Sequence, residues 1–195
     1  MSVYSPLQIG FVHIPKTGGT SVARWMLDNI PGTIKYSTDH YSASMLLDKH
    51  PNIDMLFTIV RNPWARVVST YRFVFNPTNT QRISQKLDVD ITPMPFDQFV
   101  YEGLDHKSNL WYNTATPQTR WFDRNIHVVL RQETLAEDFK QIQEMFNCSV
   151  PLPHTNKHNH DNNQHYTLFY NDKTKKRVAE LFGEDIERFK YEFDR

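Results

Sequence analysis

The sequence predicts an α/β fold of three layers, with a mostly parallel central sheet between helices. Short apolar runs alternate with segments of helical period along most of the chain. The run MLFTIV at 55–60 is continuously apolar, as expected for a parallel strand covered on both faces. The length of 195 residues is typical of one domain, and the sequence shows no internal repeat. We therefore expect residues 1–195 to form a single domain.

Strands are predicted where short apolar runs end at turn signals. Residues 8–14 form such a run and end before a proline, and residues 127–130 (HVVL) form another. The segment 55–60 gives the clearest signal, whereas 33–36 gives a weaker one for a short strand. These runs predict a sheet whose strands are separated by helices.

Helices are predicted from apolar spacing and from the residues at their ends. Ser42 caps a short helix over 42–49, and Asn62-Pro63 begins a helix that runs to about Phe75. The remaining helices are expected at 20–29, 96–101, 134–146, 172–182 and 184–191. Two polar segments without period are expected to be surface connections, namely 76–95 and 147–166.

Composition excludes several classes of protein. The chain carries 22 Lys and Arg against 22 Asp and Glu, so its formal net charge is zero and no overall field favours nucleic acid or an acidic membrane. Cys148 is the one cysteine, which excludes an internal disulfide and fits a reducing compartment. No segment reaches the ~18 apolar residues of a membrane span, and the N-terminus lacks a signal-peptide pattern. We therefore expect a cytoplasmic protein.

The segment GFVHIPKTGGTS, residues 10–21, combines a strand end, a glycine turn and a helix start. Backbone N–H groups at a helix N-terminus, together with the helix dipole, form a site for an anion. Glycines let the backbone approach the ligand, hydroxyls add donors, and a lysine adds a full positive charge. The residues that we expect to contact the anion are Lys16, Thr17, Gly18, Gly19, Thr20 and Ser21.

The order of residues in this loop differs from that of nucleoside-triphosphate loops. Those loops follow GxxxxGK[ST], with the lysine after the glycines and a hydroxyl that holds magnesium. Here the lysine precedes the glycines, and the strand 55–60 is followed by Arg61 and not by a metal-binding aspartate. The dinucleotide pattern GxGxxG is also missing. The sequence thus predicts a phosphate site without a metal; the alternative is a tight turn that needs glycines for its geometry alone.

The residues after a second predicted strand support the interpretation as a phosphate site. In VRNPWARVVSTYRF, residues 60–73, Arg61 follows the strand and Ser69 lies two turns along the next helix. The planar guanidinium group suits a phosphate, and a serine hydroxyl adds a donor. Because ligands bind at the carboxyl ends of parallel strands, we expect two neighbouring anion sites. Arg66 and Arg72 are expected to be solvated or salt-bridged.

The pair IPKTGGTS and VRNPWARVVSTYRF resembles the two signature elements of sulfotransferases that use 3′-phosphoadenosine 5′-phosphosulfate (PAPS). The resemblance is nearest to the carbohydrate branch that includes heparan sulfate 2-O-sulfotransferase, and to its small bacterial and phage-type members. It extends through PQTRWF, VLRQETLAEDF, LPHTN and ELFGEDIERFKYEF, and so over most of the chain. It implies a fold like that of P-loop nucleotide hydrolases.

The resemblance implies transfer of a sulfuryl group from PAPS to an acceptor hydroxyl, on a carbohydrate or a small metabolite. The first loop would bind the 5′-phosphosulfate, and Arg61 with Ser69 the 3′-phosphate. Lys16 would stabilise the charge on the leaving oxygen as adenosine 3′,5′-bisphosphate (PAP) departs, and no metal is needed.

The acceptor proton requires a base, for which a histidine is favoured. We choose His40, in STDHYSASMLL, because it follows a predicted strand and because the resembled family places a catalytic histidine there. Its alternative role is that of a surface residue near the next helix. His13 is the alternative base, and Glu133 is expected in the first turn of its helix.

The polar segment LPHTNKHNHDNNQHY is expected to cover the adenine and the 3′-phosphate, with Asn156 and Lys157 as ligand contacts. Its histidines lack a zinc-site spacing, and a plain solvated loop is the alternative. The tryptophans are expected to be core residues, although two of them lie in WYNTATPQTRW, which could face an acceptor.

Two other classes of function stay open. A kinase on a related fold would bind ATP with magnesium, and the order of the loop disfavours it. A non-catalytic nucleotide-binding module would bind the nucleotide without turnover. The sequence leaves the acceptor and the oligomeric state undetermined.

Overall fold

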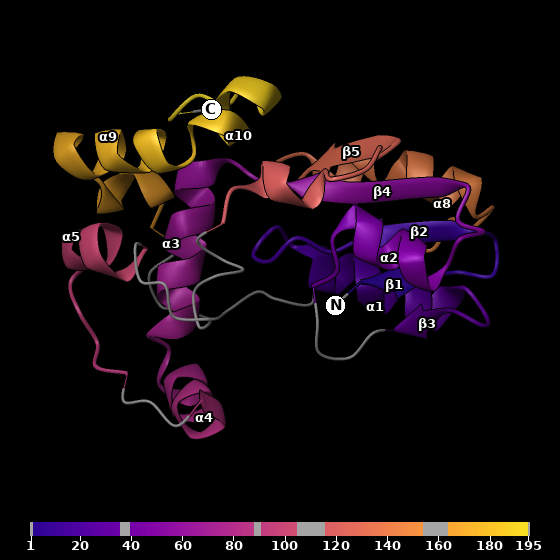
Figure 1. Ribbon diagram of the computed structural model, residues 1–195, viewed down its shortest axis with the longest axis horizontal. Helices are drawn as coiled ribbons and strands as arrows, with labels where there is room; N and C mark the ends of the chain where they lie inside the picture. Colours follow the sequence, from indigo (N-terminus) through magenta and orange to yellow (C-terminus); the bar gives the residue numbers. More distant parts are fainter. Residues whose placement is uncertain (1, 36–39, 88–90, 105–115, 154–163, 195) are drawn as a thin grey trace. The chain divides into compact units, whose positions relative to one another are not determined.

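The structure, a computed structural model, describes residues 2–35, 40–87, 91–104, 116–153 and 164–194. The chain forms two compact units, one from residues 1–61 and 118–161 and the other from 62–117 and 162–195 (Figure 1). The single domain expected from the sequence stays a prediction, and each unit is described by itself.

The first unit holds a mixed sheet, which in the described residues has five strands in the order β3-β1-β2-β4-β5. The strands are β1 (Val3–Tyr4), β2 (Ile9–Val12), β3 (Ile34–Lys35), β4 (Met55–Val60) and β5 (Val128–Arg131). β2, β4 and β5 run parallel and lie side by side (Figure 1), whereas β1 is antiparallel to β2 and β3. The four predicted strands are confirmed. β1 was missed because two residues are too few to show a period.

Helices of the first unit follow the predicted order with two exceptions, the unpredicted η2 and a break in the helix predicted over 134–146. They are α1 (Gly19–Asn29), α2 (Ala43–Lys49), the 3-10 helix η2 (Gln118–Trp121), α7 (Leu135–Asp138) and α8 (Lys140–Met145). The single helix predicted over 134–146 is wrong, since the chain breaks it into α7 and α8 at Phe139. There the amide of Ile142 bonds the carbonyl of Phe139 only three residues back, which is the tighter turn of a 3-10 helix.

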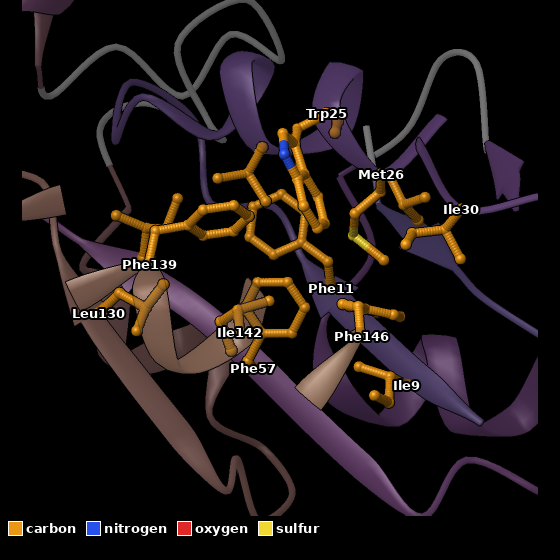
Figure 2. Close-up of a cluster of buried hydrophobic side chains, with 14 residues drawn as sticks. Ile9, Phe11, Trp25, Met26, Ile30, Phe57, Leu130, Phe139, Ile142 and Phe146 are labelled. Atoms are coloured by element: carbon orange, nitrogen blue, oxygen red, sulfur yellow. The ribbon is translucent and has the colours of Figure 1, made fainter. Parts of the chain in front are cut away.

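An aromatic cluster joins α1 and the α7–α8 segment to one face of this sheet (Figure 2). Phe11 of β2 and Phe57 of β4 stack with their ring centroids 4.9 Å apart. The Trp25 indole meets the Phe139 ring edge-on at 5.0 Å, and its Nε1–H donates to the Val150 carbonyl at 2.7 Å. This core fixes β2 and α1 relative to each other, and with them the loop that joins the two.

The opposite face of the sheet is covered by α2. Gly10 precedes Phe11 on β2, so its missing side chain would point to the other face. A Cβ atom there would lie 3.0 Å from Cδ2 of Leu46 in α2 and 2.8 Å from Cδ2 of Leu56 in β4. The glycine therefore admits the leucines of α2 and β4 to this face. The nucleotide-hydrolase class of the fold stays a prediction.

The second unit is helical in its described part. Its elements are α3 (Pro63–Val74), α4 (Pro77–Leu87), α5 (Phe96–Gln98), the π-helix η1 (Phe99–Gly103), the 3-10 helix η3 (Tyr166–Phe169), α9 (Asp172–Leu181) and α10 (Gly183–Phe189). The predicted Asn-Pro start is confirmed, because the Asn62 side chain accepts a hydrogen bond from the Trp64 amide. Trp64 and Val67 of α3 pack with Phe99 of η1 and Val178 of α9 in one buried cluster.

The loop predicted over 76–95 is wrong for its first half, where α4 forms. Asn76 begins α4 as Asn62 begins α3, since its side chain accepts from the Asn79 amide and Pro77 follows. Ile83 packs against the buried residue Val74. The signal for the start of α4 was therefore present in the sequence. The helix itself was missed because its mostly polar sequence shows only a weak apolar period.

Of the two arginines of α3, which were expected to be solvated or salt-bridged, Arg66 is buried and not solvated, whereas Arg72 is partly exposed. Arg66 is 1% exposed and donates from Nη1 to the Thr116 carbonyl at 2.9 Å. Arg72 donates from Nη2 to the Gln164 carbonyl at 3.0 Å and lies 4.8 Å from the centre of the Phe169 ring. Both guanidinium groups thus bind main-chain carbonyls within the second unit.

Candidate functional site

The turn between β2 and α1 has left-handed backbone at two positions. Lys16 has φ +67° and Gly18, the N-cap of α1, has φ +85°. Glycine adopts this conformation freely, whereas in lysine it costs about 1 to 3 kcal/mol. Such a conformation persists only where its surroundings hold it, and it is often found at functional sites.

The two glycines of the turn are needed for different reasons. Gly18 supplies the positive φ. Gly19 instead admits a neighbour, because a Cβ atom there would lie 2.7 Å from Nε2 of His13 and 2.9 Å from Cζ of Phe11. The second glycine thus lets the His13 ring lie against the first turn of α1.

The first turn of α1 contains no acidic residue. Its N-cap is Gly18, which has no side chain to form a capping hydrogen bond. The first N–H groups of a helix have no partner within the helix, and the helix dipole places a partial positive charge beside them. Thr17 is fully buried and its hydroxyl donates to the Ile14 carbonyl at 2.8 Å, which holds the turn closed. The turn can therefore bind an anion through backbone groups.

Arg61, directly after β4, is bonded to this turn. Its Nη1 donates to the carbonyl of Lys16 at 3.2 Å. Its backbone amide donates to Oε1 of Gln118 at 2.8 Å, and its carbonyl accepts from Nε2 of the same side chain at 2.9 Å. Arg61 after β4 thus contacts the backbone of Lys16 after β2, while the predicted anion contacts of both residues stay a prediction.

His40 lies beside His13 in the same unit. Nδ1 of His40 is 2.7 Å from the carbonyl oxygen of His13, and the two rings meet edge-on with centroids 4.8 Å apart. A carbonyl can only accept, so Nδ1 carries the proton and Nε2 of the neutral ring is left as an acceptor. A neutral imidazole with an acceptor nitrogen can serve as a general base. The His13 ring itself is 5% exposed and stacks on Phe11.

Asp123 anchors the helix that follows His40. Its carboxylate accepts from the Ser42 hydroxyl at 2.6 Å, from the Ser44 amide at 2.9 Å and from the Ser44 hydroxyl. Partial burial disfavours the charged carboxylate, but these hydrogen bonds outweigh it and lower the pKa of Asp123 below its ordinary value of 3.8. The segment that carries His40 is therefore tied to the chain beyond η2.

Of the remaining predicted ligands, Thr20 and Ser21 belong to this turn, whereas no described contact brings Ser69 to it. Ser69 lies on α3 in the second unit and is partly buried. Asn156 and Lys157 fall outside the described residues. Thr20 and Ser21 are partly buried in the first turn of α1, where the Ser21 amide bonds the Gly18 carbonyl at 3.2 Å.

Other candidates take ordinary positions. Glu133 is exposed and precedes α7, so its expected place in a first helical turn is wrong. The expectation of core tryptophans is confirmed for Trp25, Trp64 and Trp121, all at most 5% exposed, whereas Trp111 lies outside the described residues. Among the described residues, no cluster of His, Cys, Asp and Glu could hold a metal ion. None of the described helices is both long and apolar enough to span a bilayer.

Two residues at the site were not foreseen. Gln118 and Asp123 both lie in or next to η2, in the segment PQTRWFD, which the sequence marked only through its resemblance. Gln118 contacts a residue 57 positions away along the chain, and Asp123 contacts residues more than 70 positions away. No local feature of this segment identifies the partner of either residue.

Comparison with known proteins gives one family. The profile described as "Sulfotransferase family" matches residues 3–192, which includes nearly all of both units. No curated protein and no solved structure matches the chain.

Replacing Gly19 by alanine should destabilise the first unit. The new methyl group would displace the His13 ring, and overpacking of this kind costs about 1 to 3 kcal/mol. Urea unfolding of the variant measures the loss. The matched control is Gly183→Ala in α10, where a Cβ atom meets nothing within 4 Å and a gain of about 0.4 to 1 kcal/mol is expected. Equal effects at both glycines would contradict the close approach of His13.

Asp123→Asn should weaken the pH dependence of stability. The folded pKa of Asp123 lies below the unfolded one, so its contribution is full above about pH 4 and disappears as the pH falls through the folded value. Melting temperatures at pH 7 and pH 3 test this. Wild type should lose more than Asp123→Asn over that interval, and identical losses would show that the carboxylate is not stabilised by Ser42 and Ser44.

Proposed function

Because the chain belongs to the sulfotransferase family, we propose that it moves a sulfuryl group from PAPS to a hydroxyl group of an acceptor. The observation that carries this proposal is the turn at Lys16. It has left-handed backbone, ends at the uncapped N-terminus of α1, and is bonded to Arg61 at the end of the neighbouring parallel strand. The donor carries anionic groups at both ends of its ribose, which such a pair of strand ends suits.

The first turn of α1 would bind the 5′-phosphosulfate. Its backbone N–H groups and dipole favour an anion, and no acidic side chain in that turn opposes one. The residues proposed to contact this group are Lys16, Thr17, Gly18, Gly19, Thr20 and Ser21. Because the Thr17 hydroxyl already donates to Ile14, Thr17 would contribute its amide.

Lys16 would act at the bond that breaks. The acceptor oxygen forms a bond to sulfur while the bond from sulfur to the 5′-phosphate oxygen breaks, and negative charge develops on that leaving oxygen. An ammonium group fixed beside it stabilises the transition state more than the ground state. β4 ends at Arg61 and not at a carboxylate, so the proposed reaction relies on Lys16 for this charge.

His40 would take the acceptor proton. Its Nδ1 is held by the His13 carbonyl, which leaves Nε2 to accept the proton as the acceptor oxygen attacks sulfur. PAP then leaves with the electron pair of the broken bond, and the His40 proton is lost to solvent. His13 is less suited to this role, since its ring is buried between Phe11 and Gly19.

The 3′-phosphate is proposed to bind Arg61 and Ser69, on the strength of the motif VRNPWARVVSTYRF. Asn156 and Lys157 are proposed as further contacts to the nucleotide. A carbohydrate or a small metabolite is the proposed acceptor, and membership of the heparan sulfate 2-O-sulfotransferase branch, a bacterial or phage-type origin and a cytoplasmic location are proposed with it.

A thermal-shift screen tests the donor. A ligand at ~100 times its Kd adds about 2.7 kcal/mol to the free energy of unfolding. PAP should therefore raise the melting temperature in the presence of a metal chelator, while ATP should have little effect with or without magnesium. A shift by ATP that requires magnesium, and none by PAP, would point to a kinase and reject the proposal.

A radiolabelled transfer assay on a panel of hydroxyl-bearing acceptors tests turnover. Transfer of labelled sulfate from PAPS to at least one acceptor supports the enzyme. Binding of PAP without transfer to any member of a panel that spans sugars and phenols would favour a non-catalytic nucleotide-binding module.

Lys16→Ala should lower the transfer rate ~10²–10³-fold, as expected when one preorganised donor to a developing charge is lost. The turnover number under saturating donor is the measurement. The control is Lys140→Ala on α8, an exposed lysine paired with Glu137 at 2.8 Å, which should leave turnover unchanged. Wild-type turnover in Lys16→Ala would remove this lysine from the mechanism.

His40→Ala should keep PAP affinity and lower turnover by ~10²–10⁴-fold. Calorimetric titration with PAP, together with turnover under saturating donor, checks both points. Loss of PAP affinity at unchanged turnover per bound donor would instead make His40 a structural residue.

A further inference from the structure

Gln118 is a buried polar residue that the proposed reaction does not use. It opens η2 and is 0% exposed. Its side-chain amide makes two hydrogen bonds to one residue, accepting from the Arg61 amide at 2.8 Å and donating to the Arg61 carbonyl at 2.9 Å. A neighbouring strand pairs with a residue in the same way, through one N–H and one carbonyl.

This pair of bonds lies where β2 no longer supports β4. The last register pair between the two strands is Val12 with Thr58, three residues before Arg61. On the other side of β4, the pairing with β5 ends at Val60 and Arg131. Arg61 therefore lies beyond the sheet. The Gln118 side-chain amide takes the place of a neighbouring strand there and pairs with the backbone of this one further residue.

Arg61 in turn holds the strained turn. Its Nη1 donates to the carbonyl of Lys16, the residue with φ +67°. The orientation of this carbonyl is coupled to the backbone conformation of Lys16, and so to the direction in which its side chain leaves the chain. A chain of hydrogen bonds thus runs from Gln118 through Arg61 to Lys16, entirely within the first unit.

We propose that Gln118 is a positioning residue that fixes the backbone of Arg61 and, through the Arg61 guanidinium, the conformation of Lys16. The proposal rests on the function proposed above for its effect on catalysis. In the free protein, however, it also predicts a structural linkage that does not depend on any substrate.

Glutamine is the residue type that this position requires. Its primary amide carries both a donor and an acceptor, whereas glutamate offers only acceptors when ionised and leucine offers neither. Gln118→Glu would place a carboxylate against the Arg61 carbonyl, and Gln118→Leu would leave two buried backbone groups without their partner.

A double-mutant cycle tests the route through Arg61. Gln118→Leu should lower kcat for sulfuryl transfer ~10–100-fold, since a misplacement of about 1 Å can cost 10²-fold. In an Arg61→Met background, which removes the guanidinium, the same change should alter kcat by no more than about twofold. An equal loss of kcat in both backgrounds would overturn the proposal, because a general structural defect does not depend on the guanidinium.

Hydrogen exchange of the free protein supplies a readout that needs no activity. Exchange of the Arg61 amide and of the amides of residues 16–19 should accelerate in Gln118→Leu. The matched control is Gln143→Leu on α8, whose side-chain amide donates to the Val150 carbonyl at 2.5 Å away from this turn. The control should leave exchange at both places unchanged.

The two failures can be told apart. If wild type transfers no sulfuryl group and binds no PAP, the proposed function is rejected, and exchange at residues 16–19 still decides whether Gln118 is linked to Lys16. If wild type is active but Gln118→Leu accelerates exchange at Arg61 alone, the linkage to Lys16 is overturned while the proposed function stands. The positioning role is supported if Gln118→Leu accelerates exchange at both places and lowers kcat only in protein that retains Arg61.

Discussion

The left-handed backbone at Lys16 is the constraint on which the candidate site of the first unit depends. A lysine does not keep this conformation on its own, so neighbouring groups must hold it. The Arg61 guanidinium bonds its carbonyl, and the Thr17 hydroxyl closes the turn on Ile14. The unfavourable conformation of Lys16 is therefore held by contacts from Arg61 and Thr17.

Apolar packing and hydrogen bonds stabilise different features of the turn between β2 and α1. The aromatic cluster around Phe11, Trp25 and Phe139 sets the distance and direction between β2 and α1. This packing does not favour one turn conformation over another, because apolar contacts are non-directional. Hydrogen bonds from Arg61 and Thr17 make that choice, and a missing side chain at Gly19 leaves room for the His13 ring.

His13 links the turn to the proposed base. Its ring lies against Gly19, while its carbonyl accepts from Nδ1 of His40. One strand-end residue thus contacts both the helix N-terminus that suits an anion and the imidazole that suits a proton. Asp123 adds a third attachment through Ser42 and Ser44. The proposed base is therefore held by a main-chain carbonyl, and the start of the helix that follows it is held by the Asp123 carboxylate.

The sequence by itself determined the local structure at the site: strands β2 and β4, the caps at Ser42 and Asn62, and the glycine turn at the start of α1. These follow from apolar period, turn residues and helix-end signals, which act over a few residues. It failed where such signals were weak, at the two-residue β1 and at α4.

Only the tertiary structure decided which distant groups meet. The contacts of Gln118 with Arg61, of Asp123 with Ser42 and of His40 with His13 join residues 57, 81 and 27 positions apart. Such pairings depend on how strands and helices pack, and a side-chain amide or carboxylate carries no mark of its partner in the sequence. The sequence therefore predicts the residues of the turn itself, whereas the distant contacts that hold them are decided by the tertiary fold.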